Sequence, residues 1–141
     1  MRLFAWVLLA LLSLATHLAA QSVHDVLLEG DSASGRYRFT PAHVSARPGE
    51  VLRFVVRSGP PHTIVFATAG LSARVRAALD AALPDRLREL EGPLLVRVGT
   101  EYRVTVPAIP AGAYRFFCLA HFAQGMSGEL TVVGRTRIAP P

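Results

Sequence analysis

The sequence places three side chains that could bind a metal close together near its C-terminus, in the pattern C-x2-H-x4-M. Cys118, His121 and Met126 lie in or directly after the stretch Y-R-F-F-C-L-A-H-F-A-Q-G, and an apolar stretch upstream contributes His62. One thiolate, two imidazoles and one thioether are the ligands of a mononuclear copper electron-transfer site. Soft sulfur suits Cu(I) and imidazole suits both oxidation states. We therefore expect a site in which one copper ion changes its charge with little rearrangement.

Other interpretations of the same residues are weaker. A lone cysteine in an apolar segment is usually a small buried hydrophobe, and histidine or methionine can also fill a core, but independent core residues need not form this pattern. A Cys–His pair could act as nucleophile and base, yet no orienting residue stands out. Zinc sites do not use thioethers. No Gly-rich phosphate loop or paired-carboxylate motif is present, so we expect no catalytic residues and no enzyme.

The elements that must position these ligands are short strands. Alternating or β-branched apolar residues bounded by turn residues predict strands at 23–28, 36–40, 43–46, 51–57, 62–68, 94–98, 101–106, 113–118 and 128–133. His62 would then begin a strand after two prolines, and Cys118 would end one, with the next two ligands on the loop beyond. His24 and His43 lack this context, and we expect both at the surface. Strands at this spacing predict an all-β sandwich or barrel.

The middle of the chain has a helical pattern. Leu71, Val75, Leu79 and Leu83 recur every four residues, and Ser72 can cap the start. Pro84 should end this helix, and a second short helix is expected over 85–91. We expect a helical insertion at about 71–92 rather than a second domain, because so few residues cannot bury a core of their own.

The first twenty of the 141 residues have the layout of a secretory signal peptide. Arg2 precedes an apolar run from 3 to 14, and Ala19 and Ala20 precede a predicted cut before Gln21. An uncleaved anchor is the alternative. We expect a periplasmic or otherwise exported protein with one domain at 21–134 and a loose tail at 135–141.

Charge and cysteine content fit this interpretation. The whole chain carries a net charge of +5, and without Arg2 the remaining 14 arginines and 10 acidic residues give +4. The arginines form no basic run of the kind that binds nucleic acid, but they favour an acidic docking partner. Cys118 is the sole cysteine, so no internal disulfide can form. Metal coordination would protect this thiol from oxidation in an exported protein.

The segments H-T-I-V-F and Y-R-F-F-C-L-A-H-F-A-Q-G-M-S-G-E-L-T-V resemble those of the small blue-copper proteins, or cupredoxins. Within that family they are similar to the plastocyanin-like group that includes pseudoazurin and amicyanin, and F-T-P-A-H-V-S-A-R-P-G-E-V-L-R-F is similar to the segment ahead of its first copper histidine. The resemblance implies a Greek-key β-sandwich with one type 1 copper bound by His62, Cys118, His121 and Met126.

The sequence departs from the family pattern in three places. Thr63 stands where family members commonly have an asparagine that ties the two ligand-bearing loops together, and Ala120 stands where proline is frequent. The insertion at about 71–92 is also longer than the usual connection. These departures bear on the reduction potential and the partner more than on the metal.

The resemblance implies an exported carrier of single electrons. The solvent-side edge of His121 would be the electron port, and Cys118 would offer a second exit toward Phe116 and Phe117. An apolar collar around the port comprises Leu119, Ala120, Phe122, Ala123, Pro60 and Pro61. We expect a monomer that docks transiently with a redox protein such as a cytochrome or a copper enzyme, without nucleic acid or stable membrane insertion after signal removal.

Two other functions stay open at this point. A copper-binding protein that stores or delivers the metal would need the same ligands but no electron traffic. A metal-free adhesion or scaffold module could use the same sandwich.

Overall fold

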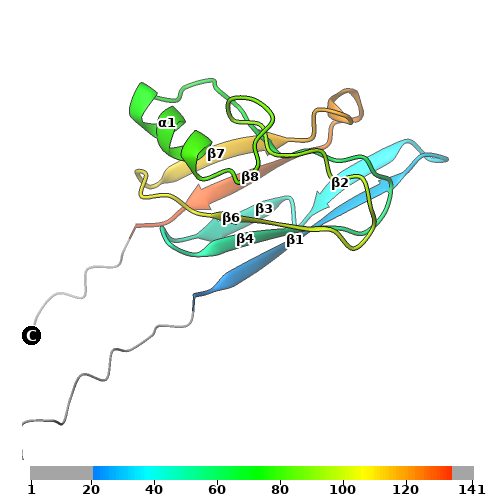
Figure 1. The fold of residues 1–141 in the computed structure, drawn as a ribbon, viewed down its shortest axis with the longest axis horizontal. Helices are drawn as coiled ribbons and strands as arrows, with labels where there is room; N and C mark the ends of the chain where they lie inside the picture. Colours follow the sequence, from blue (N-terminus) through cyan, green and yellow to red (C-terminus); the bar gives the residue numbers. More distant parts are fainter. Residues whose placement is uncertain (1–20, 135–141) are drawn as a thin grey trace, which may run out of the picture.

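The computed structural model describes residues 21–134, in which two four-stranded sheets pack face to face (Figure 1). The predicted signal peptide (1–20) and tail (135–141) lie outside these residues. The first sheet has the order β2-β1-β4-β6, formed by β2 (Arg36–Thr40), β1 (Val23–Asp31), β4 (Val51–Val56) and β6 (Glu101–Thr105). The second has the order β3-β8-β7-β5, formed by β3 (His43–Ala46), β8 (Ser127–Val132), β7 (Gly112–Phe117) and β5 (Val65–Phe66).

Strand alternation builds the core between the sheets. In β4, Leu52, Phe54 and Val56 are fully buried, as the alternating pattern predicts. Rings from both sheets meet edge to face: the ring centroid of Phe116 lies 4.9 Å from that of Phe39 and 5.6 Å from that of Phe54. Such aromatic pairs add to the burial energy of the core.

Both sheets are mixed, because the chain crosses repeatedly from one to the other. β1 pairs with β4 in parallel, and β3 pairs with β8 in parallel, whereas the other neighbours are antiparallel. The predicted all-β sandwich is therefore confirmed. Its parallel contacts join strands that are far apart in sequence, such as β3 and β8.

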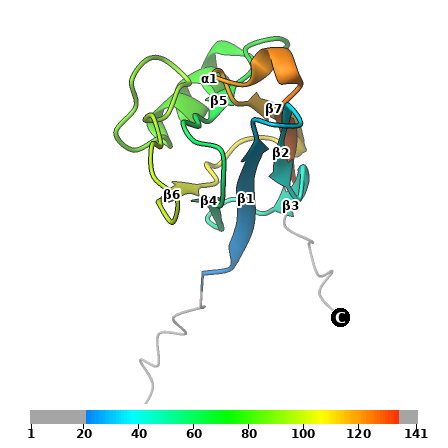
Figure 2. The ribbon, with the colours of Figure 1, turned by 90° about the vertical axis from the view of Figure 1, so that its right-hand side faces the viewer.

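The insertion contains one helix, α1 (Ala73–Ala81). Ser72 caps it by accepting a hydrogen bond from the Val75 N–H over 3.3 Å, and Val75 and Leu79 bury the predicted apolar face. In Figure 1, α1 lies at the left of the molecule and the 3₁₀ helix η1 (Phe122–Gln124), drawn in orange, lies toward the right, whereas the view along the long axis in Figure 2 shows both at the top. The helix of the insertion thus lies away from the end that carries η1.

The prediction of a second helix over 85–91 is wrong. Asp85 and Leu90 have φ angles of 48° and 60°, which a right-handed helix does not allow. The segment instead pairs with the β5 region: the Phe66 N–H donates to the Leu90 carbonyl over 3.0 Å, and the Gly92 N–H donates to the Ile64 carbonyl over 2.9 Å. Tertiary pairing therefore overrides the local helical pattern.

The strand predicted at 62–68 is shorter than expected, and the one predicted at 94–98 is absent apart from a single bridge at Leu95. β5 spans only Val65–Phe66, while His62 and Leu95 form an isolated bridge in which their backbone groups exchange hydrogen bonds of 3.0 and 2.8 Å. The chain just after the insertion therefore lies beside His62. Within residues 21–134, no helix has the length and apolar character needed to cross a membrane.

Candidate metal centre

Three of the four predicted ligands come together in a buried cluster. The ligand atoms of His62, Cys118 and His121 all lie within 4.8 Å of one another. The Cys118 Sγ lies 3.5 Å from the His121 Nδ1 and 3.9 Å from the His62 Nδ1. Each imidazole therefore presents the same nitrogen, Nδ1, to the sulfur.

The His62 ring is oriented by its other nitrogen. Its Nε2–H donates to the Ser58 carbonyl over 2.8 Å, which leaves Nδ1 free as a ligand atom. The backbone of His62 is held at the same time by the bridge to Leu95. His62 is fully buried, so neither its ring nor its backbone can move without breaking these contacts.

Cys118 follows the end of β7, and Thr63 holds it in place. The Cys118 Sγ accepts a hydrogen bond from the Thr63 N–H over 3.4 Å, and the Thr63 Oγ1 accepts one from the Leu119 N–H over 2.9 Å. Thr63 therefore ties the two ligand-bearing segments together, although its side chain is shorter than that of the asparagine that is common at this position in the cupredoxins.

A tight loop joins the remaining ligands. The Met126 N–H donates to the His121 carbonyl over 3.2 Å, and the Cys118 N–H donates to the Met126 carbonyl over 3.0 Å. Gly125 makes this return possible, because its φ of 77° is in the left-handed region that glycine adopts without strain. The Met126 side chain is fully buried, and the backbone bonds place this residue next to both Cys118 and His121.

The electrostatics of the cluster favour the ligand forms of its groups. Burial raises the pKa of the Cys118 thiol, but the close His62 ring and the hydrogen bond from the Thr63 N–H outweigh it and bring the pKa below its ordinary value. Burial lowers the pKa of His121, and the neighbouring His62 adds to this effect. A thiolate beside a neutral imidazole is the state that binds a metal.

The outer side of the cluster carries a contact that the sequence did not reveal. The Tyr37 ring from β2 stacks on the His121 ring with centroids 3.7 Å apart and planes 12° apart. Only 8% of His121 is exposed, whereas Leu119 and Phe122 beside it are 48% and 63% exposed. Tyr37 lies two residues before the core residue Phe39, so the alternation of β2 predicts that both face the same way. That Tyr37 also contacts His121 depends on the pairing of β2 with β1, which the sequence does not reveal.

The other two described histidines lie apart from the cluster. His43 is exposed, and His24 is half-buried with its Nε2 2.8 Å from a carboxylate oxygen of Glu50. This agrees with the expectation that neither belongs to the site, although His24 is less exposed than expected.

The donor set selects among metals. A thiolate, two imidazoles and a nearby thioether are soft or intermediate donors, which suit copper and do not suit Mg²⁺ or Ca²⁺. Zinc would leave Met126 without a role. The residues present therefore fit one copper ion.

Comparison with known proteins agrees with this chemistry. Residues 24–133 match the family described as copper binding proteins, plastocyanin/azurin family. The chain is 30% identical to plastocyanin of Nostoc punctiforme over 129 residues, which cover 91% of this chain and 88% of that protein. It is 33% identical to the copper-resistant cuproprotein CopI of Rubrivivax gelatinosus over 103 residues, which cover 70% of this chain and 62% of that protein.

A solved structure shows the same fold. The oxidized form of plastocyanin from Dryopteris crassirhizoma superposes with a TM-score of 0.62 at 30% identity, covering 78% of this chain and all of that chain.

Proposed function

This chain belongs to the plastocyanin/azurin family of copper-binding proteins, and we propose that it carries single electrons between redox partners. We assign His62, Cys118, His121 and Met126 as the ligands of one copper ion. Copper held there would supply one-electron chemistry between Cu(I) and Cu(II). The proposal rests on one observation above all: the donor atoms of His62, Cys118 and His121 converge, buried, within 4.8 Å of one another.

The fixed donors are what suits the site to rapid electron transfer. The Ser58 carbonyl orients His62, the Thr63 N–H bonds to the Cys118 sulfur, and the loop back to Met126 closes on the Cys118 backbone. Because these contacts do not involve the metal, they would resist the geometry that either oxidation state prefers alone. A small change in geometry means a small barrier to gaining or losing an electron.

The surface around His121 suits brief docking. Leu119 and Phe122 are exposed on the same loop as His121, and Pro61 is exposed just before His62. A small apolar contact of this kind is typical of short-lived redox encounters. The net charge of +4 that remains without Arg2 would steer an acidic partner, such as a cytochrome or a copper enzyme, toward the protein.

Several proposals concern the protein as a whole. We propose that residues 1–20 direct export, that 21–134 form the copper-binding domain, and that the protein acts as a monomer without an enzymatic role. The sole cysteine, Cys118, is compatible with export, because its sulfur lies buried among groups that bind metal and would be protected from oxidation.

Stopped-flow kinetics test the proposed role. The reduced protein is mixed with an oxidised, acidic cytochrome, and the bimolecular rate should fall as ionic strength rises, because salt screens the attraction. Leu119→Ser should slow the reaction. The matched control is Val23→Ser. Val23 is 44% exposed, compared with 48% for Leu119, and it lies at the start of β1, whereas the turn to β2 follows the end of that strand.

Copper storage or delivery is the second candidate, favoured by the similarity to CopI, whose name describes a copper-resistant cuproprotein. Slow electron transfer at every salt concentration, together with ready release of copper to a competing chelator, would support storage and contradict the carrier proposal.

A further inference from the structure

The Tyr37–His121 stack is more specific than ordinary core packing. The two rings are nearly parallel, 12° apart, with centroids 3.7 Å apart. The aromatic pairs in the core, by contrast, meet edge to face with centroids 4.9 to 6.3 Å apart. Tyr37 is itself half-buried, so its ring lies between solvent and the imidazole.

The backbone of β1 makes room for this ring. Tyr37 pairs with Gly30 across the β1–β2 ladder. A Cβ at position 30 would lie 2.5 Å from both Cδ1 and Cε1 of Tyr37, which is shorter than any normal contact. Only glycine therefore lets the ring lie flat against β1, and the Tyr37 side chain is held between Gly30 and His121.

The same strand end also supports the second imidazole. The Gly30 N–H donates to the Ser58 Oγ over 3.0 Å, and the Ser58 carbonyl accepts from the His62 Nε2 over 2.8 Å. The turn between β1 and β2 is thus connected to both histidines, to His62 through Ser58 and to His121 through Tyr37. Because residues of β1 and β2 reach both imidazoles, we infer that they serve the site as well as the core.

We propose that Tyr37 is a positioning residue of the copper site, which fixes the plane of the His121 imidazole and keeps water from its face. This inference rests on the proposed copper site. Water solvates charge better than an aromatic face does, so shielding disfavours the oxidised, more highly charged state of the site. The Tyr37 ring therefore raises the reduction potential.

Two variants distinguish the effect of the aromatic ring of Tyr37 from the effect of its apolar volume. Tyr37→Phe keeps the aromatic ring, whereas Tyr37→Leu keeps apolar bulk without it. NMR of the metal-free protein measures the stack directly, because the ring current of residue 37 shifts the His121 ring protons upfield. We expect this shift in the wild type and in Tyr37→Phe, and its loss in Tyr37→Leu.

The copper-loaded proteins give the second measurement. Spectroelectrochemical titration should give Tyr37→Phe the potential of the wild type and Tyr37→Leu a lower one. Gly30→Ala provides an independent route, since it displaces the ring without removing it, and it should lower the potential in the same direction. It also keeps the test decisive if Tyr37→Leu does not fold.

An unchanged potential in the folded variants that lose the upfield shift would overturn the inference, even if their melting temperature fell, because Tyr37 would then serve stability alone. An absent upfield shift in the wild type would overturn it as well. Failure of the proposed function has a different signature: wild-type protein that binds copper but is not reversibly reduced, while the metal-free NMR arm still detects the stack.

Discussion

Thr63 shows how much of the site depends on groups that do not touch the metal. It is 3% exposed, and it links the His62 segment to the Cys118 segment twice: its N–H bonds to the Cys118 sulfur, and its Oγ1 accepts from the Leu119 N–H. The backbone bond needs only the N–H of residue 63, so every substitution except proline keeps its donor. The hydroxyl bond needs threonine or serine at this position, so a substitution can remove it while the backbone bond stays.

Thr63→Val removes this hydroxyl while keeping the shape of the side chain. We expect the free energy of unfolding of the metal-free protein to fall by about 1 kcal/mol, the net contribution of one such hydrogen bond. Urea denaturation measures it, and Thr63→Ser, which keeps the hydroxyl, is the control. Equal stability of wild type and Thr63→Val would show that the bond to Leu119 contributes nothing.

The types and spacing of the ligands could be predicted from the sequence, but the residues that hold those ligands in place could not. C-x2-H-x4-M with an upstream histidine indicates copper because few other metals use all of these donors. Tyr37 carries no such chemical signal. Its part in the site follows from the pairing of Gly30 with Tyr37, and a single strand does not reveal which residue of its neighbour lies opposite.

Among the elements, most predicted strands formed, but the strand at 62–68 is reduced to Val65–Phe66, the one at 94–98 is absent, and the insertion contains one helix instead of two. β4 and β6 lie within a residue or two of their predicted bounds, since one face of each is buried. The helix predicted over 85–91 fails because its end pairs with Ile64 and Phe66. The Asp80 carboxylate also accepts from the Leu90 N–H over 2.9 Å, which holds the returning chain against α1.

The insertion is consequently part of the core, and Leu79 tests this. Its side chain is fully buried, so Leu79→Ala should lower the free energy of unfolding by about 2–5 kcal/mol. Arg74→Ala, an exposed change on the same helix, should stay within about 0.5 kcal/mol of the wild type. Thermal unfolding of both variants distinguishes an integral insertion from an appended one, for which Leu79→Ala would be nearly neutral.

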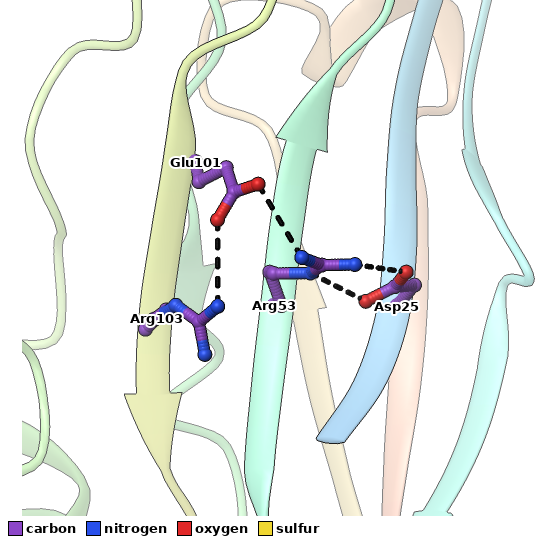
Figure 3. A network of polar contacts seen from close by, with 4 residues as sticks. All are labelled: Asp25, Arg53, Glu101 and Arg103. Atoms are coloured by element: carbon purple, nitrogen blue, oxygen red, sulfur yellow. Dashed lines mark hydrogen bonds and ion pairs between the residues drawn. The ribbon is translucent and has the colours of Figure 1, made fainter.

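Over the whole molecule, ion pairs on the sheet surfaces link stability to pH. On the first sheet, the Arg53 guanidinium donates two hydrogen bonds to Asp25, over 2.7 and 2.6 Å, and also contacts Glu101, which in turn contacts Arg103 (Figure 3). The hydrogen bond from Arg53 lowers the pKa of Asp25. Hydrogen bonds from nearby groups lower the pKa of three further carboxyl groups, those of Glu29, Asp31 and Glu50.

A carboxyl group whose pKa is lower in the folded state stabilises the protein above its unfolded pKa, about 4, and loses that contribution as the pH falls through its folded value. The free energy of unfolding should therefore decrease on acidification below about pH 4. Asp25→Asn should be less stable than the wild type at pH 7, and the difference should shrink at pH 3. Urea denaturation at both pH values measures it, and a difference that does not change with pH would contradict this role of Asp25.

The most direct test of the copper site is an anaerobic titration of the metal-free protein with Cu(II), followed by visible absorption. The wild type should develop an intense thiolate-to-copper band that saturates at one equivalent, and His43→Ala, which alters an exposed histidine outside the cluster, should behave in the same way. Cys118→Ser should bind without this band. A wild type that stays colourless, or a Cys118→Ser variant that keeps the band, would contradict the assignment of Cys118 as a copper ligand and the electron-carrier role built on it.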